Sequence, residues 1–390
     1  MKALFIDASV TELKKNYLVI AKYIKEREPD FEALFLSVDT ASYVVESMEL
    51  EASRLLTSNG FNVYTEKSFN AQIIERRLNE LKSDFLFIDA MNVSNQVWNI
   101  VSHKLNIPVY MYPHGFQIDN LFYKKSELLS KVVKVLRYTY GVYQISKLMG
   151  RPFSKVYKAY TNYIKKGDAL VNTAMDHPLL YPDVVYIYSE YYKEFWHRKY
   201  GITDVKYEYI MPLDFTLVPE VLEKPQENAL CYITQTLHED GRYTKEEYKD
   251  LLRSYIPLAK SVDCFYIKLH PRVELTMYDE IFADIPSVKI VRDFPNCTCY
   301  LTHYSSMAYT GALISGNVII HELPRQPTHE VYQEVASEIT HNVEETINAA
   351  KRLMVKPIPS FEDRKKIISK FASYTGISPY ETLYKSIFKK

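Results

Sequence analysis

Three short polar motifs in the second half of the chain each follow an apolar run of the length of a buried strand. They occupy residues 232–241, 265–272 and 299–307. Ligands of open parallel sheets collect at the carboxyl ends of the strands. The motifs are therefore predicted to lie together at one edge of a sheet.

The first motif places two carboxylates side by side, Glu239 and Asp240, in a turn that Gly241 permits. A hydroxyl that attacks a sugar must lose its proton. One carboxylate can accept that proton, and its neighbour can tune the pKa by like-charge repulsion. The same three residues are also common in surface turns, so the motif indicates a base only in combination with the others.

The second and third motifs carry groups suited to phosphate. His270 could donate a hydrogen bond to a leaving phosphate, and Arg272 or Lys268 could neutralise its charge. Ser305 and Ser306 stand where a helix is expected to begin, and hydroxyls with backbone N–H groups at such a place bind phosphate. The alternatives are a structural histidine and a plain helix cap, which needs one serine.

A further carboxylate, Glu322, follows the apolar run at 318–320. Carboxylates accept hydrogen bonds from hydroxyls. We expect Glu322 to be a candidate ligand for the ribose of a nucleotide.

The elements that must position these groups are short apolar runs alternating with helical, Lys/Glu-rich stretches. This layout predicts a doubly wound α/β fold with two Rossmann-like domains facing each other across a cleft. We place the domains at 1–225 and 226–390, with the last helix crossing back and a linker at 212–225. The expected strands are 3–6, 33–36, 61–64, 85–88, 109–112, 169–171, 184–188, 229–233, 264–269, 288–291, 299–302 and 318–320.

The composition is that of a globular protein without a global electrostatic preference. The 390 residues are 47% hydrophobic, carry no formal net charge and include 34 tyrosines. The four cysteines lack zinc-ribbon spacing and are expected to be reduced thiols. The first residues form too short an apolar run for a signal peptide, and no stretch is long enough to span a bilayer. We therefore expect a cytoplasmic protein, soluble or peripheral at the inner membrane.

Positive charge is concentrated between residues 121 and 167. This stretch has eleven Lys or Arg residues, one acid (Glu127) and many interleaved tyrosines and phenylalanines. Such a composition suits the anionic inner leaflet or an anionic acceptor glycan. A solvated helical face with tyrosines packed beneath it is the alternative. No nucleic-acid-binding motif is present, and we expect no nucleic-acid partner.

The order Glu-Asp-Gly, His-Pro and a serine pair resembles the bacterial sialyltransferases of the two-Rossmann-domain (GT-B) type. The spacing, with Thr234-Gln235 ahead of Glu239-Asp240-Gly241 in the first motif, most resembles the lipooligosaccharide sialyltransferase family. The resemblance covers about residues 229–325. It implies inverting transfer of sialic acid from CMP-sialic acid to a surface glycan, lipooligosaccharide or capsule, with no metal or other cofactor. Consistently, the sequence contains no Asp-x-Asp.

The resemblance also implies roles for individual residues. Asp240 would be the general base, with Glu239 as its support or its alternative. His270 would contact the CMP phosphate and protonate it, and Ser305 and Ser306 would bind the same phosphate. Gln235 belongs to the donor-side motif, and Phe294 with Pro295 would lie near the cytosine. Some members of the family are dimers, so a homodimer is a further expectation.

One motif in the first half departs from that pattern. His114 stands between Pro113 and Gly115 after another apolar run, and could orient the acceptor or serve as the base. A similar His-Gly run occurs in CDP-glycerol transferases and capsule Kdo transferases. The alternatives are therefore another CMP- or CDP-dependent transferase, or a non-catalytic glycan-binding protein on the same fold.

Overall fold

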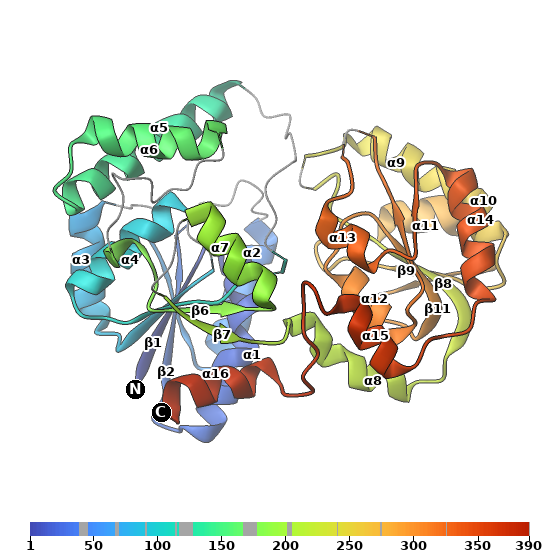
Figure 1. The fold of residues 1–390 in the computed structure, drawn as a ribbon, viewed down its shortest axis with the longest axis horizontal. Helices are drawn as coiled ribbons and strands as arrows, with labels where there is room; N and C mark the ends of the chain where they lie inside the picture. The colour runs from blue at the N-terminus through green and yellow to red at the C-terminus, as the bar shows by residue number, and fades with distance from the viewer. Residues whose placement is uncertain are drawn as a thin grey trace. The chain divides into compact units, whose positions relative to one another are not determined.

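The computed structural model describes the chain in two compact units (Figure 1). Unit 1 comprises Met1–His114, Glu127–Ile210 and Ser378–Lys390, and unit 2 comprises Gly115–Ser126 and Met211–Ile377. The described residues are 1–38, 46–66, 70–89, 92–113, 115–116, 128–166, 178–200, 205–239, 241–273, 275–324 and 326–389.

Within its described residues, unit 1 is built on a seven-stranded parallel sheet of order β3-β2-β1-β4-β5-β6-β7. Its strands are β1 (Lys2–Asp7), β2 (Glu32–Ser37), β3 (Asn62–Thr65), β4 (Phe85–Ile88), β5 (Val109–Met111), β6 (Val184–Ile187) and β7 (Lys206–Tyr209). Its helices are α1 (Val10–Arg27), α2 (Glu46–Ser58), α3 (Ala71–Leu81), α4 (Val93–Lys104), α5 (Leu128–Leu148), α6 (Phe153–Lys166), η1 (Pro178–Leu180), α7 (Glu190–Tyr200) and α16 (Pro379–Phe388).

In the described part of unit 2, a six-stranded parallel sheet has the order β10-β9-β8-β11-β12-β13. Its strands are β8 (Glu227–Ile233), β9 (Phe265–Lys268), β10 (Val288–Val291), β11 (Cys297–Thr302), β12 (Val318–His321) and β13 (Glu338–Thr340). Its helices are η2 (Leu213–Leu217), α8 (Val218–Glu223), α9 (Lys245–Ser254), α10 (Ile256–Lys260), α11 (Thr276–Phe282), α12 (Met307–Ile314), α13 (Glu330–Val335), α14 (Val343–Met354) and α15 (Phe361–Ile368).

The predicted fold class is confirmed as two Rossmann-like α/β folds. Strands β4 and β10 match their predicted bounds, and every other predicted strand within the described residues overlaps an observed one. The expected strand at 169–171 lies outside the described residues. Two strands were not predicted: β7, which has alternating charged residues and exposed ends, and β13, which has three residues. Neither has the continuous apolar run of a strand buried on both faces.

The predicted linker and the last helix show how the chain passes between the two units. The proposed linker at 212–225 is mostly helical, as η2 and α8, and it buries Phe215, Val218 and Val221. The last helix, α16, packs on α1 of unit 1, and the Tyr384 hydroxyl donates to the Glu28 carboxylate at 2.7 Å. Residues 378–390 therefore belong to the same unit as the N-terminus (Figure 1).

Strand β8 shows why the central strands of unit 2 read as apolar runs. Leu230 and Tyr232 lie in one buried cluster with side chains of α9, α10, α11 and α14. Cys231 and Ile233 lie in a second buried cluster with α8 and α12. Both faces of the sheet are thus covered, and the carboxyl edge remains for ligands. All four cysteines are free thiols, as predicted.

Candidate active site

The strand order of unit 2 places its topological switch point between β8 and β11. A switch point is where consecutive connections leave to opposite sides of an open sheet, and ligands bind at its carboxyl edge. The segments that follow β8, β9 and β11 meet there through side chain–backbone hydrogen bonds. Thr234 Oγ1 accepts from the His270 backbone N–H at 2.8 Å, and Gln235 Oε1 accepts from the Tyr304 N–H at 3.2 Å. The three sequence motifs are therefore brought together at one edge.

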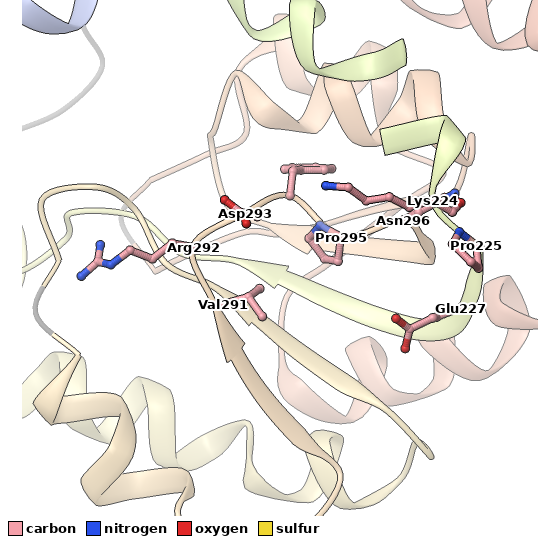
Figure 2. Close-up of a pocket in the computed structure, with 9 residues that line it drawn as sticks. Lys224, Pro225, Glu227, Val291, Arg292, Asp293, Pro295 and Asn296 are labelled. Atoms are coloured by element: carbon pink, nitrogen blue, oxygen red, sulfur yellow. Dashed lines mark hydrogen bonds between the residues drawn. The ribbon is translucent and has the colours of Figure 1, made fainter. Parts of the chain in front are cut away.

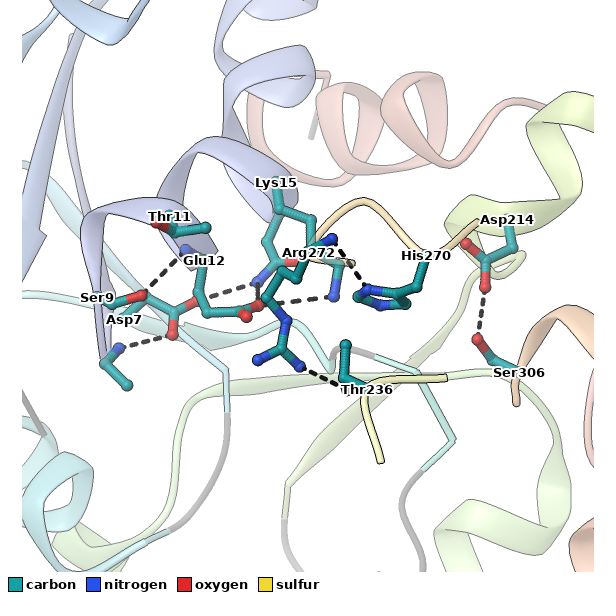
Figure 3. A network of polar contacts seen from close by, with 12 residues as sticks. Asp7, Ser9, Thr11, Glu12, Lys15, Asp214, Thr236, His270, Arg272 and Ser306 are labelled. Carbon is teal, nitrogen blue, oxygen red and sulfur yellow. Dashed lines mark hydrogen bonds and ion pairs between the residues drawn. The ribbon is translucent and has the colours of Figure 1, made fainter. Parts of the chain in front are cut away.

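His270 is held in a defined tautomer. Its Nδ1 accepts a hydrogen bond from the Arg272 backbone N–H at 3.2 Å (Figure 3). In the neutral imidazole the proton is then on Nε2. This is the nitrogen that a phosphate oxygen would need as a donor. The half-buried ring can thus act as a directed hydrogen-bond donor.

The Arg272 guanidinium is fixed beside the same histidine. Its Nη2 donates to Thr236 Oγ1 at 3.1 Å, which ties the β9 loop to the β8 loop. A guanidinium recognises phosphate through several hydrogen bonds in one plane. Thr234 and Thr236 were part of the predicted motif, but the sequence analysis gave them no role. Their position could have indicated a role, because both hydroxyls lie in the first three residues after the buried strand β8.

The two serines before α12 have different partners. Ser305 Oγ accepts from the Met307 N–H at 3.2 Å, whereas the Ser306 hydroxyl donates to Asp214 Oδ2 at 2.7 Å (Figure 3). Since Ser305 uses its oxygen as acceptor, its O–H is oriented away from Met307 and can donate to an anion. The Ser306 hydroxyl already directs its proton to a carboxylate. In this arrangement Ser305 is the better of the two serines for donating a hydrogen bond to a phosphate.

Lys268 ends β9, and its ammonium lies near the Ser306 partner. Burial lowers the pKa of the Lys268 ammonium, and the carboxylates of Asp214 and Asp293 act against that change. An added phosphate would likewise favour the charged ammonium. Asp214, on η2, was missed by the sequence analysis because it comes from a segment far away in the chain.

The Glu-Asp-Gly turn is described only in part. Asp240, the predicted base, lies outside the described residues. Glu239 is half-buried. Burial raises the pKa of the Tyr278 hydroxyl, and the Glu239 carboxylate contributes to that rise. Gly241 has a φ of +67°, the left-handed conformation that glycine adopts without strain. The turn therefore has the predicted backbone geometry at its glycine.

A pair of buried histidines supports the β11 and β12 ends beneath this edge. His303 Nδ1 donates to the His321 carbonyl at 2.7 Å, and its Nε2 accepts from the Tyr232 hydroxyl at 3.1 Å. The Tyr255 hydroxyl contacts His321 Nδ1. Burial lowers the pKa of His303 to about 3 and that of His321 to about 4. Both rings are therefore neutral near pH 7, and the described hydrogen bonds of each are to groups inside unit 2.

This pair predicts a loss of stability in mild acid. The folded-state pKa values lie below the unfolded value of about 6.5, so the unfolded chain binds protons first as the pH falls. Each histidine should reduce the free energy of unfolding by about 1.4 kcal/mol per pH unit below that value. Urea unfolding between about pH 7.5 and about pH 5 measures the effect. His303→Asn should flatten the profile and exposed His197→Asn should not; equal slopes in all three proteins would refute this role.

Phe294 and Pro295 border a surface cavity of about 420 Å³ (Figure 2). The Phe294 ring is buried and stacks on Tyr300 with centroids 5.1 Å apart, and the Pro295 carbonyl accepts from the Tyr300 hydroxyl at 2.7 Å. Both residues thus have packing roles. The cavity is lined by Lys224, Pro225, Glu227, Val291, Arg292, Asp293, Phe294, Pro295 and Asn296.

Glu322 follows β12 and already holds a neighbouring loop. Its Oε2 accepts from the Thr328 N–H at 2.6 Å, and its Oε1 lies 3.4 Å from His341 Nδ1. The backbone hydrogen bond from Thr328 lowers the pKa of this carboxyl group. Glu322 is therefore ionised and fixed in position, as a carboxylate that accepts from ribose hydroxyls must be.

The helix N-terminus at the edge of the first sheet is filled by the chain itself. The N–H groups of Val10 and Thr11, which begin α1, donate to the Glu49 carboxylate at 2.7 and 2.9 Å. A helix N-terminus after the first strand is where Rossmann folds bind phosphate. In unit 1 an internal carboxylate takes that place. The other unit 1 candidate, His114, lies outside the described residues.

Metal-ligating residues do not cluster in the part of the chain that the structure describes, where no three His, Cys, Asp or Glu side chains are placed to share an ion. Among the same residues, no helix is long and apolar enough to cross a membrane.

Solved structures similar to this chain include glycosyltransferases and sugar-nucleotide epimerases. The glycosyltransferase VinC, in complex with dTDP, has a TM-score of 0.53 at 12% identity over 98% of both chains. The UDP-GlcNAc 2-epimerase of Neisseria meningitidis, bound to UDP-GlcNAc, has a TM-score of 0.52 at 12% identity over 100% of both chains. The kitacinnamycin glycotransferase has a TM-score of 0.53 at 10% identity, over 100% of this chain and 98% of its own. These likenesses establish the GT-B fold. No protein-family model and no curated protein matches the sequence.

Proposed function

We propose that this protein is a glycosyltransferase that binds a sugar nucleotide at the carboxyl edge of the second sheet. The observation that supports the proposal is that three groups suited to binding phosphate follow the strands at the switch point. His270 presents an Nε2 proton, Arg272 is anchored on Thr236, and Ser305 has a hydroxyl proton to donate. In unit 1, Glu49 takes the place of a phosphate at the N-terminus of α1, which favours unit 2 as the donor site.

The donor that the motifs favour is CMP-sialic acid. In an inverting transfer, the oxygen of an acceptor hydroxyl attacks the anomeric carbon while the bond from that carbon to the phosphate oxygen breaks. The leaving electron pair stays on the phosphate oxygen of CMP, and the Nε2–H of His270 donates a hydrogen bond that stabilises this charge. Asp240 takes the proton of the acceptor hydroxyl, with Glu239 as its neighbour. The acceptor would be a bacterial surface glycan, and no metal takes part.

Another cytidine nucleotide donor, CMP-Kdo or CDP-glycerol, is the second candidate. The Pro113-His114-Gly115 run favours it, and Gly115 has the positive φ of +62° that such a turn needs. Direct assay with CMP-sialic acid and CMP-Kdo separates the two. Since similar folds are bound to UDP-GlcNAc or dTDP, nucleotides with other bases are compared with CMP in the test.

The test is a thermal-shift titration with CMP, CDP, UDP, dTDP and GDP, each with and without EDTA. A ligand that binds only the folded state raises the melting temperature, by mass action. We expect CMP to stabilise the protein, EDTA to leave the shift unchanged, and Arg272→Leu to abolish it. Exposed Arg253→Leu is the matched control. Stabilisation by UDP or dTDP alone would show that the donor is a uridine or thymidine nucleotide and not a cytidine nucleotide. If no nucleotide shifted the melting temperature, a non-catalytic glycan-binding protein would be favoured.

A further inference from the structure

Helices α5 and α6 of unit 1 form a pair with an unusual distribution of charge. Residues 128–166 include nine Lys or Arg residues and no Asp or Glu. Four of the described cations, Lys147, Arg151, Lys155 and Lys158, are exposed, and Arg137 is half-buried. The whole protein has no formal net charge. This pair is therefore a local positive surface on a neutral molecule.

The first half of α5 exposes a group of aliphatic side chains. Val132, Val133, Val135 and Leu136 have exposed fractions of 51, 49, 59 and 63%. Single exposed aliphatic residues are common, but four within five positions form an apolar patch. Contact with an apolar surface would remove this patch from water, which is favourable.

An aromatic row continues from that patch onto α6. Tyr140, Tyr143, Phe153 and Tyr157 are each between 37 and 40% exposed. Their successive ring centroids lie 6.5, 6.1 and 5.4 Å apart. Lys147 lies 5.3 Å from the centre of the Tyr143 ring. Tyrosine and phenylalanine next to lysine are typical of the interface between lipid headgroups and acyl chains.

The opposite side of the helix pair is anchored to the rest of unit 1. The Ala71 N–H donates to Gln144 Oε1 at 3.2 Å, and the Tyr160 hydroxyl donates to Gln96 Oε1 at 2.5 Å. Val142 and Val156 are fully buried. The exposed row is thus displayed on a fixed support, to which the Tyr140 hydroxyl also contributes by accepting from Asn70 Nδ2 at 2.9 Å.

We propose that α5 and α6 dock the protein on an anionic lipid surface, with the aliphatic patch and the aromatic row at the headgroup level and the lysines against lipid phosphates. Charge complementarity selects this partner, since each cation near an anionic leaflet strengthens binding. The same charge opposes a second copy of the surface. Exposed valines and leucine have no use in nucleic-acid binding, which relies on cations and stacking. The docking is independent of the donor chemistry proposed above.

The experiment is flotation of the full-length protein with vesicles of phosphatidylcholine alone or mixed with phosphatidylglycerol. We expect binding to the mixed vesicles only, weakened by salt. Lys155→Glu/Lys158→Glu should lower the partition coefficient by at least roughly 30-fold, at about five-fold for each lost cation. Val132→Ser/Leu136→Ser should also lower it.

Matched double variants elsewhere test whether the location matters. Lys351→Glu/Lys356→Glu makes the same change of charge on exposed lysines of unit 2, and Leu50→Ser/Val355→Ser removes exposed aliphatic side chains. Both should bind vesicles as the wild type does. Equal loss in these controls, equal binding to neutral vesicles, or binding of single-stranded RNA in place of vesicles would overturn the proposal. Circular dichroism of every variant ensures that a lost fold is not read as lost binding.

Discussion

Replacing His270 with alanine is expected to lower kcat for sugar transfer by about 100- to 1,000-fold, the usual effect of removing one preorganised donor from a developing anion. Donor affinity should fall as well, because the same Nε2 proton would contact the phosphate before and during the reaction. The prediction depends on the hydrogen bond from the Arg272 N–H to His270 Nδ1, which places the ring proton on Nε2. Steady-state kinetics with varied CMP-sugar give kcat and KM separately.

Two amide variants distinguish this role from a structural one. The amide of His270→Gln can reach the position of Nε2 and donate from it, whereas that of His270→Asn can replace Nδ1 and accept from Arg272. If donation to phosphate is the function of His270, the glutamine variant should retain more activity than the asparagine variant. The reverse order would assign His270 to holding the loop. His197→Ala, an exposed histidine in unit 1, controls for loss of a histidine as such.

Most of the fold was predictable from the sequence because its central strands are buried on both faces. The run at 85–88 matches the strand β4, whose four residues are all buried. In strands of this kind local composition and tertiary burial agree. β7 and β13 could not be found in this way, since an edge strand with charged residues has the composition of a loop.

The candidate site was predictable as a position, but its contacts were not. Strand-end motifs indicate the carboxyl edge, yet the sequence does not show that the Ser306 hydroxyl donates to Asp214, which lies 92 residues earlier in the chain. It also does not distinguish His270 from His303, since both histidines follow a buried strand. Only burial separates them: His303 is enclosed between Tyr232 and the β12 backbone, whereas His270 is half-exposed.

Replacing Asp240 with asparagine is expected to lower kcat by about 100- to 10,000-fold, the range for loss of a general base. Donor binding should be unchanged, because the base contacts the acceptor hydroxyl and not the nucleotide. Asparagine keeps the shape of the side chain and cannot accept the proton. Turnover with the acceptor and the CMP-induced thermal shift, measured on the same variant, separate chemistry from binding.

The competing bases are Glu239 and His114, and each predicts a different pattern across the same assays. If Glu239 is the base, Glu239→Gln should have the large effect and Asp240→Asn the small one. If His114 is the base, His114→Ala should abolish turnover while Asp240→Asn retains near-normal activity. A pH–rate profile adds a further criterion, because a carboxylate base loses its proton at a lower pH than an imidazole does. We expect Asp240→Asn to show the largest loss of the three, since in the resembled family the Glu-Asp-Gly run carries the base.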